Sequence, residues 1–403
     1  MIVANNSALR ICTAIAQNFL PHARVLAESI AEHHPGCRLD VLVVDAPEPE
    51  TMFGEPFRRV SPSELALPRE ELHRRLTLYD TAALLSSLRS PLLAGCLARG
   101  SGPVLYLDAD MLVLGSLADV GELIARHGIV LTPHATVPLP FRAGGYGPEQ
   151  TFLRAGVFNG GFLGVSPAAV DFLAWRDERV ARDCVVAFDR GIFLGQAWLA
   201  LVPALFDHHV LRDRGVNLLG PGLGADDLDW RGDRPWIGET PVRLFHFGGA
   251  FEPYSGELAP RLPDPIWPRT SERPGLARLC KEYGQRLLKA GYGSRPAKGH
   301  AWLDWAMRDV YRAALFDAET NGTAEPPNPF THGINAFNAW LAEPAWPGSK
   351  ISRYLAAIRA GRDDLRAHFT DIPGAHEDEL LRWVASKYPN GLPDGLPTAV
   401  ISL

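Results

Sequence analysis

Lysine is scarce in this sequence. The 403 residues contain five lysines, and all of them follow residue 280. An anion that binds to the first 280 residues must therefore be held by arginine, histidine, backbone N–H groups or a metal ion. The formal net charge of −6 is also unlike that of a dedicated nucleic-acid-binding protein, which normally carries a basic excess or a basic patch. We therefore expect no nucleic-acid partner.

Cysteine is also scarce, and long apolar runs are absent. The five cysteines are scattered and form no CxxC pair, which is typical of reduced thiols in a cytosolic protein. The chain does not open with a basic segment followed by an apolar run, and no stretch reaches the roughly 18 apolar residues of a membrane span. We expect a cytoplasmic protein without a transmembrane segment.

The length predicts more than one domain. A chain of 403 residues exceeds what one hydrophobic core usually organises, and its 46% hydrophobic and 21% charged residues are ordinary for a globular protein. Residues 252–275 contain six prolines, and the segments after them have a helical composition. We predict a first domain over residues 1–255, and a proline-rich linker with a helical domain over residues 256–403.

The first 45 residues predict the fold class. Residues 8–15 and 38–45 are predicted as buried strands, and residues 20–36 as the helix between them. A strand, a helix and a strand at this spacing form a βαβ unit, whose strands are parallel and covered by helices. We therefore predict an α/β fold.

An apolar strand in this chain ends in two carboxylates. Residues 69–99, which are helical in composition but interrupted at Pro91, lead to a strand at 103–107 that is followed by Asp108 and Asp110. Side chains two residues apart on an extended chain point the same way, so both carboxylates face one spot beyond the carboxyl end of the strand, where α/β proteins bind ligands. Two hard oxygen donors fit Mg²⁺ or Mn²⁺ holding a diphosphate. In the alternative interpretation, one Asp caps the turn and the other is solvated.

Further motifs stand in order along the chain. Residues 156–162 read GVFNGGF and include Asn159, while residues 242–254 read VRLFHFGGAFEPY and include His246. The first strand is followed by NFLPHARVLAESI. Together with YLDAD, these segments resemble the motifs of retaining, metal-dependent nucleotide-sugar glycosyltransferases of the glycogenin and bacterial galactosyltransferase family, family 8. They resemble more closely its relatives from bacterial polysaccharide clusters. The resemblance covers roughly residues 8–255.

The resemblance implies a GT-A fold, with a mixed and mostly parallel sheet flanked by helices, and a nucleoside diphosphate sugar as donor. It implies Asp108, Asp110 and His246 as ligands of Mn²⁺ or Mg²⁺, and the imidazole favours Mn²⁺. The sugar would pass with retention to a hydroxyl of a glycan, lipid-linked sugar, peptide or small molecule, and a homo-oligomer is compatible with this. The other implied site residues are Arg89, Asn159 and Gln196 for catalysis, and Thr13, Phe19, Asp108, Asn159 and Gly249 for donor binding.

Two positions depart from the family pattern. Glu252 stands where the family signature has a lysine, and Gly195 stands where relatives carry an aspartate. A carboxylate at position 252 would repel the diphosphate, so we predict that Glu252 points out of the site or forms a salt bridge, with Arg89 neutralising the diphosphate. His134 is either a donor or acceptor contact or a strand cap, and Asn217 is either a sugar contact or a turn residue.

Two other functions stay open. A sugar-nucleotide-binding protein that has lost turnover would also show the departures at Gly195 and Glu252. Haloacid-dehalogenase-type phosphatases likewise have an apolar strand that ends in Asp-x-Asp. However, they have Thr or Val where this chain has Leu112, and they need a downstream lysine, which does not occur before Lys281. The glycosyltransferase hypothesis therefore fits the sequence best.

Overall fold

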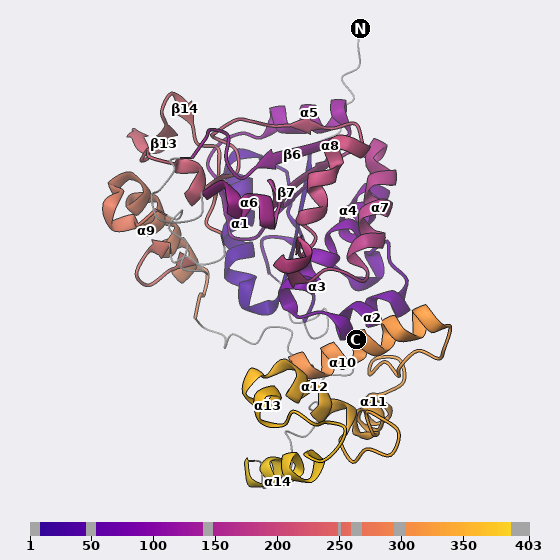
Figure 1. Cartoon of the computed structure of the whole chain (residues 1–403). Helices are drawn as coiled ribbons and strands as arrows, with labels where there is room; N and C mark the ends of the chain where they lie inside the picture. The colour runs from indigo at the N-terminus through magenta and orange to yellow at the C-terminus, as the bar shows by residue number, and fades with distance from the viewer. Residues whose placement is uncertain are drawn as a thin grey trace. The chain divides into compact units, whose positions relative to one another are not determined.

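The structure, a computed structural model, describes residues 9–45, 54–139, 148–248, 251–258, 268–293 and 303–387. The chain forms two compact units. The first contains Met1–Leu67 and Leu85–Gly299, and the second contains Pro68–Leu84 and His300–Leu403. In Figure 1 the first unit is a sheet with helices around it, and the second is a group of helices.

A seven-stranded sheet lies at the centre of the first unit. Its strands, in spatial order, are β10 (His209–Val210), β6 (Ile129–Pro133), β7 (Phe158–Val165), β4 (Val104–Leu107), β1 (Arg10–Ile15), β2 (Asp40–Val43) and β3 (Arg58–Val60). β4, β1, β2 and β3 are parallel, as are β6 and β10, whereas β7 is antiparallel to β4 and β6. The predicted α/β class and the mixed, mostly parallel sheet are confirmed.

Helices cover both faces of this sheet. On one face, α1 (Leu20–His33) and α5 (Ala118–His127) join the apolar side chains of β1 and β4. On the other, α4 (Arg89–Ala98) packs against β1 and β4, and α7 (Val170–Val180) packs beside α4 (Figure 1). The alternation of β1 explains this arrangement: Ile11 and Ile15 belong to the α1 side, whereas Cys12 meets Cys96 of α4.

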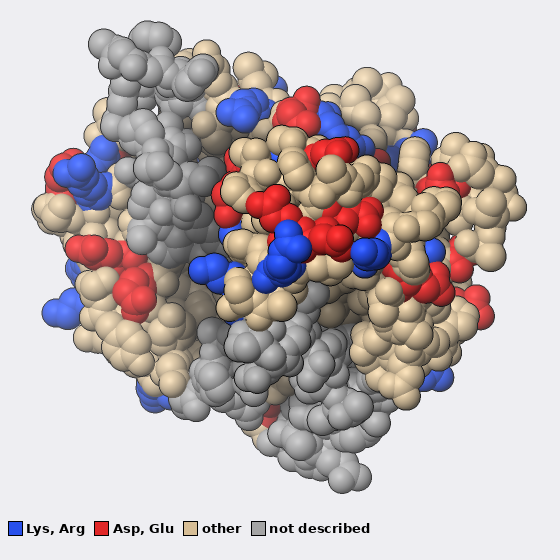
Figure 2. Space-filling model, turned by 60° about the horizontal axis from the view of Figure 1, so that its bottom comes forward, with Lys and Arg blue, Asp and Glu red and all other residues tan. Residues whose placement is uncertain are grey.

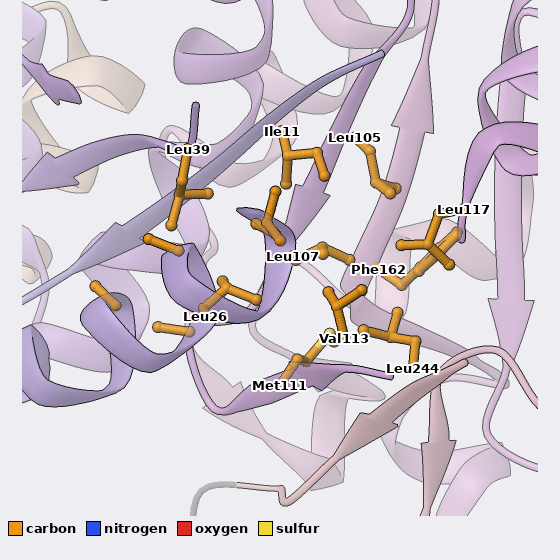
Figure 3. Packing of buried hydrophobic residues seen from close by; sticks show 14 of the residues in the cluster. Ile11, Leu26, Leu39, Leu105, Leu107, Met111, Val113, Leu117, Phe162 and Leu244 are labelled. Carbon is orange, nitrogen blue, oxygen red and sulfur yellow. The ribbon is translucent and has the colours of Figure 1, made fainter. Parts of the chain in front are cut away.

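The main core of the first unit lies between the sheet and α1. Figure 3 shows Leu26 of α1 and Ile11, Leu107 and Phe162 of the sheet as members of one cluster, and all four side chains are almost completely buried. Fully burying one such side chain contributes roughly 1.5–3 kcal/mol. This packing holds the end of β4, where the two aspartates begin.

A second, three-stranded sheet continues from that point. It consists of β11 (Leu218–Leu219), β15 (Leu244–His246) and β5 (Met111–Val113), in this spatial order. β15 is antiparallel to β5, with His246 opposite Met111, and the N–H of Phe247 donates to the carbonyl oxygen of Asp110 at 3.0 Å. The strand pairing thus brings His246 to the turn that carries the aspartates.

The remaining elements of the first unit surround these sheets. α9 (Pro274–Lys289) covers the second sheet, and the Tyr283 ring stacks on Phe247 with ring centroids 3.7 Å apart. The others are α6 (Pro148–Ala155), β8 (Val186–Ala187), β9 (Ile192–Phe193), α8 (Val202–Leu205), β12 (Asp229–Arg231), β13 (Arg234–Ile237), β14 (Thr240–Pro241), β16 (Phe251–Glu252) and β17 (Glu257–Leu258).

The second unit is helical where the structure describes it. Its helices are α2 (Arg69–Leu78), α10 (Trp305–Asn321), α11 (Ile334–Ala342), α12 (Arg353–Gly361), α13 (Asp363–His368) and α14 (Glu377–Lys387). Asn328 links α2 to α10, because its amide donates to the carbonyl oxygen of His73 at 3.1 Å and to the Tyr311 hydroxyl at 3.3 Å. A segment of the N-terminal half therefore folds with the C-terminal helices.

Pro91 does not interrupt a helix, which corrects the sequence prediction. Residues 69–99 form three helices: α2, α3 (Thr81–Ser87) and α4, and the breaks fall at residues 79–80 and 88. Pro91 lies in the first turn of α4, where a missing N–H removes no hydrogen bond within the helix. A proline at this position is compatible with the start of a helix.

The stretch Thr81–Ala98 is long and apolar enough to cross a membrane by length and composition alone, but 61% of it is buried inside the protein.

At the surface, the charges are mixed. Figure 2 shows a face on which acidic and basic side chains are interspersed. Ion pairs such as Arg353–Glu343 and Lys350–Asp378, each 2.9 Å long, join opposite charges in the second unit.

We expect Leu107→Ala to lower the free energy of unfolding by about 2–5 kcal/mol, because it opens a cavity in the core that holds the end of β4. Leu153→Ala is the control, since Leu153 is 75% exposed and should change stability by less than about 0.5 kcal/mol. Urea unfolding followed by circular dichroism measures both. Equal losses in the two variants would contradict the role of this core.

Candidate metal centre

Three possible metal ligands converge at the carboxyl end of β4. Asp108 and Asp110 lie in the turn between β4 and β5, and His246 is the last residue of β15. One ligand atom from each of the three side chains lies within 4.8 Å of the other two. The resemblance implies these residues as one ligand set, and the structure brings them together.

Asp110 and His246 form a buried pair. The His246 Nε2 atom is 3.2 Å from Asp110 Oδ1, and the two side chains are 5% and 11% exposed. Burial alone would raise the pKa of Asp110, but the charge and hydrogen bond of His246 outweigh it and lower the pKa. Burial likewise acts to lower the pKa of His246, and the Asp110 carboxylate reverses this and raises it. The pair thus stabilises a buried negative charge while leaving oxygen atoms for a cation.

Arg89 and Tyr106 hold the other carboxylate. The Arg89 Nη2 group donates to Asp108 Oδ1 at 2.8 Å, and the Tyr106 hydroxyl donates to the same oxygen at 3.1 Å. The Arg89 guanidinium also lies over the Tyr106 ring, 4.8 Å from its centroid. The other carboxylate oxygen, Asp108 Oδ2, faces Gly161, where a Cβ atom would lie 2.5 Å from it. Arg89 therefore lies beside Asp108 and bonds to it directly.

The glycines of the GVFNGGF segment bring backbone close to the ligands. The N–H of Asp108 donates to the carbonyl oxygen of Gly161 at 2.8 Å, which joins β7 to the aspartate turn. A side chain at Gly161 would meet Asp108, His246 Cε1 at 2.8 Å and Asn159 Oδ1 at 2.9 Å. Only glycine therefore fits at position 161 without moving the ligands.

Gln196 braces the same segment. Its Oε1 accepts the N–H of Gly160 at 2.8 Å, and its Nε2 donates to the carbonyl oxygen of Ala155 at 2.9 Å. The Arg89 Nη1 group donates to the carbonyl oxygen of Gly160. Arg89 and Gln196, both predicted as catalytic, therefore both bind the backbone of Gly160, Gln196 through its N–H and Arg89 through its carbonyl oxygen.

Arg176 occupies the space beside Gly195. A Cβ atom at Gly195 would lie 2.3 Å from Arg176 Nη2 and 3.0 Å from Ser86 Oγ. Arg176 Nη2 donates to the carbonyl oxygen of Gly195 at 3.3 Å, and Ser86 Oγ accepts the Gly195 N–H at 3.0 Å. Burial, together with the charge of Arg89, lowers the pKa of Arg176 to about 10, so it remains a cation at neutral pH. Gly195 is thus packed against a buried arginine.

Thr13 and Phe19, two of the residues predicted to contact the nucleotide-sugar donor, lie among the described residues. Thr13 is buried in β1, and its Oγ1 has no hydrogen-bond partner among the described residues. Phe19 stacks on His22 with ring centroids 4.5 Å apart. Gly249 lies outside the described residues. A buried hydroxyl without a partner is compatible with a polar ligand nearby.

The structure places Glu252 at the surface, and His134 and Asn217 beside Asn159. Glu252 is exposed, and its Oε1 accepts the N–H of Tyr254 at 3.1 Å within the turn between β16 and β17. His134 and Asn217 are both hydrogen-bonded to Asn159, at 3.3 Å each. Arg89 forms its ion pair with Asp108.

Tyr106, Ser86 and Arg176 support the site but were not predicted. Tyr106 had a signal in the sequence, because it lies two residues before Asp108 on a strand and so faces the same side. Ser86 and Arg176 have no local signal, since they reach Gly195 from α3 and α7, far away in the sequence.

The donor set fits a divalent metal ion. Two carboxylates supply hard oxygen ligands, and His246 supplies a borderline nitrogen ligand, a combination that suits Mn²⁺ and other first-row ions better than Ca²⁺. Asp108 is 27% exposed along its side chain, so the cluster opens toward solvent on that side. The arrangement is able to hold a cation that also binds an external anion.

Comparisons with known proteins give likeness to solved structures only. No family model matches the chain, and no curated protein matches it. Three similar structures are galactosyltransferase LgtC with donor and acceptor sugar analogues (18% identity, 68% of this chain and 95% of that chain, TM-score 0.38), glycosyltransferase GlyE of Streptococcus pneumoniae TIGR4 (13%, 77% and 65%, 0.38) and mouse xyloside xylosyltransferase 1 (12%, 60% and 97%, 0.38). All these TM-scores lie below 0.5, so function is inferred below from the residues of this chain.

We expect Gly195→Ala to destabilise the protein by about 1–3 kcal/mol, because the added methyl group meets the Arg176 guanidinium and a packed arginine must move. A double-mutant cycle with Arg176→Ala tests the cause. The cost of Gly195→Ala should shrink by more than about 0.5 kcal/mol in that background. Thermal unfolding of the four proteins measures the coupling, and strictly additive costs would show that Arg176 does not fill this space.

Proposed function

We propose that the first unit is a retaining, metal-dependent glycosyltransferase that moves a sugar from a nucleoside diphosphate sugar to an acceptor hydroxyl. The observation that supports this most strongly is the convergence of Asp108, Asp110 and His246 beyond the carboxyl end of β4. Ligands of α/β proteins bind at this edge of the sheet. A cluster of two carboxylates and one imidazole there suits Mn²⁺, and also Mg²⁺, bound to a diphosphate.

The residues around the cluster are assigned roles on this proposal. Asp108, Asp110 and His246 would hold the metal ion, which when bound supplies Lewis-acid stabilisation of the departing diphosphate. Arg89 keeps its charge at any physiological pH and is suited to grip phosphate oxygens, because its guanidinium presents several donors in one plane. Gln196 keeps the Gly160 peptide in place beside it. Most of the acceleration would come from positioning and electrostatics.

We also propose which residues contact the nucleoside of the donor, and which classes of molecule serve as the acceptor. Thr13, Phe19 and Gly249 are proposed to contact the nucleoside, because the resemblance implies these contacts. The acceptor is proposed to be a hydroxyl of a glycan, lipid-linked sugar, peptide or small molecule. A cytoplasmic location is proposed as well, and the five free cysteines support it.

We expect Asp108→Asn and His246→Ala each to lower the rate of sugar transfer or donor hydrolysis by about 10²- to 10³-fold, because each removes a ligand of the metal ion. The measurement is release of nucleoside diphosphate from a panel of UDP-, GDP- and dTDP-sugars with Mn²⁺. EDTA should abolish the activity of the unsubstituted protein, and Mn²⁺ should restore it.

Asp119→Asn is the matched control for these variants. Asp119 is also paired with an arginine, Arg243, at 2.6 Å, but its side chain is 54% exposed and lies outside the ligand cluster. The activity of the Asp119→Asn variant should stay within about twofold of that of the unsubstituted protein, because an exposed ion pair contributes little. Activity that survives EDTA and both ligand substitutions would contradict the proposal. Metal-dependent binding of a nucleotide sugar without any turnover would favour a binding protein instead.

We expect Glu252→Gln to leave the affinity for UDP, GDP or dTDP with Mn²⁺ within about twofold, because the carboxylate is exposed and already bonded to its own turn. Titration calorimetry measures this. A gain of tenfold or more on neutralising Glu252 would show that this carboxylate faces the diphosphate after all.

A further inference from the structure

Four polar side chains, three of them buried, form a continuous hydrogen-bonded chain that starts at His246. His246 Nδ1 is 3.2 Å from Asn217 Oδ1, Asn217 Nδ2 is 3.3 Å from Asn159 Oδ1, and Asn159 Nδ2 is 3.3 Å from His134 Nε2. His246, Asn217 and Asn159 are each at most 5% exposed. Water therefore has little access to these contacts, and each polar atom depends on its protein partner.

A backbone N–H fixes the direction of the hydrogen bonds near the metal ligands. The Gly161 N–H lies 2.9 Å from the side chain of Asn159, and because an N–H can only donate, the Asn159 atom that it meets is the oxygen. Asn217 must then present its NH₂ group to that oxygen and its own oxygen to His246. It follows that His246 carries a proton on Nδ1, which leaves Nε2 facing Asp110.

A backbone carbonyl fixes the direction of the hydrogen bonds at the His134 end of this chain of side chains. His134 Nδ1 lies 3.3 Å from the carbonyl oxygen of Val157, which can only accept, so this nitrogen carries a proton. His134 Nε2 then accepts from the Asn159 NH₂ group, which requires a neutral imidazole. Burial lowers the pKa of His134 to about 4, in agreement with this neutral form. Both ends thus dictate the same orientation of the two asparagines.

We propose that Asn217 and Asn159 are positioning residues that keep a proton on Nδ1 of His246, so that Nε2, which faces Asp110, is the nitrogen that gives up its proton and binds the metal ion. This inference rests on the metal site of the proposed function. It also changes the role of Asn159, which the resemblance implied as a catalytic contact. The Asn159 oxygen already accepts from Gly161 and Asn217, so Asn159 acts through His246. A histidine ligand whose other nitrogen is anchored keeps its ring orientation and tautomer.

The backbone of Asn217 makes a clean test available. Asn217 has φ of +57°, in the left-handed region that glycine adopts without strain. Its amide is fixed a second time, because Nδ2 also donates to Thr132 Oγ1 at 2.7 Å. Asn217→Gly therefore removes the amide and its contacts without adding backbone strain. Asn217→Asp keeps an oxygen acceptor for His246 and also tolerates this conformation.

The experiment measures metal binding directly. The unsubstituted protein and its variants are titrated with Co²⁺, whose visible absorption reports the coordination of the ion, and with Mn²⁺ in competition. We expect Asn217→Gly to weaken binding by about 10- to 100-fold and to change the Co²⁺ spectrum, as is typical when a partner of a histidine ligand is lost. Asn217→Asp should recover most of the lost affinity. A recovery separates tautomer control from a loss of packing.

Asn328→Gly is the matched control. Asn328 is a buried asparagine in the second unit whose amide makes three hydrogen bonds, to His73, Thr77 and Tyr311, so its loss should cost similar stability without changing metal affinity. Metal affinity of Asn217→Gly within twofold of the unsubstituted protein would overturn the proposal. If Asn217→Gly does not fold, affinity of Asn217→Asp below one tenth of normal would overturn it instead. If the unsubstituted protein binds neither ion, the metal site itself is overturned. This result differs from one in which the protein binds metal and the Asn217 substitution has no effect.

Discussion

The constraint on which the site depends is the placement of two carboxylates at the end of a buried strand. An unpaired carboxylate in the interior costs several kcal/mol, so the surrounding side chains must compensate each charge. They do so asymmetrically. Asp108, 27% exposed, is paired with Arg89 and bonded to Tyr106, whereas Asp110, 11% exposed, is paired with His246. One carboxylate is thus supported by a permanent cation and the other by a group that is able to exchange its proton for a metal ion. This difference leaves the cluster ready to accept a divalent cation without being rebuilt.

The pairing of β15 with β5 is what brings His246 to the aspartates, although the two strands are far apart in the sequence. Successive side chains of a strand face opposite sides, so Phe245 and Phe247 point away from the site when His246 points into it. Both phenylalanines belong to the core cluster that also contains Tyr283 of α9. A slip by one residue would expose His246 to that apolar core and turn a phenylalanine toward the carboxylates, so the hydrophobic packing fixes the register. α9, which follows the proline-rich segment, therefore supports the metal ligands indirectly.

Patterns with short periods could be predicted from the sequence, and contacts between distant segments could not. The βαβ unit follows from hydrophobic spacing within the first 45 residues, and the shared face of Asp108 and Asp110 follows from the two-residue period of a strand. The convergence with His246 was predicted from the resemblance of ordered motifs and not from spacing. Nothing local indicates that α2 folds with helices more than 200 residues later, or that Arg176 fills the space beside Gly195. From the sequence, Asn217 is predicted only as a sugar contact or as a turn residue. Its left-handed backbone fits a turn, while its amide forms a link that exists only in three dimensions.

The arginines explain how a sequence without lysine in its first 280 residues could meet an anion. Arg176 is bonded to neutral acceptors, namely Ser90 Oγ and the carbonyl oxygens of Ser86 and Gly195, so its charge is not cancelled by a carboxylate in these contacts. Burial and the nearby charge of Arg89 both lower the pKa of Arg176. Two like charges held together in the interior favour any anion that approaches them. Because Gly195 has no side chain, it adds no carboxylate beside Arg176, and this side of the site keeps its positive charge.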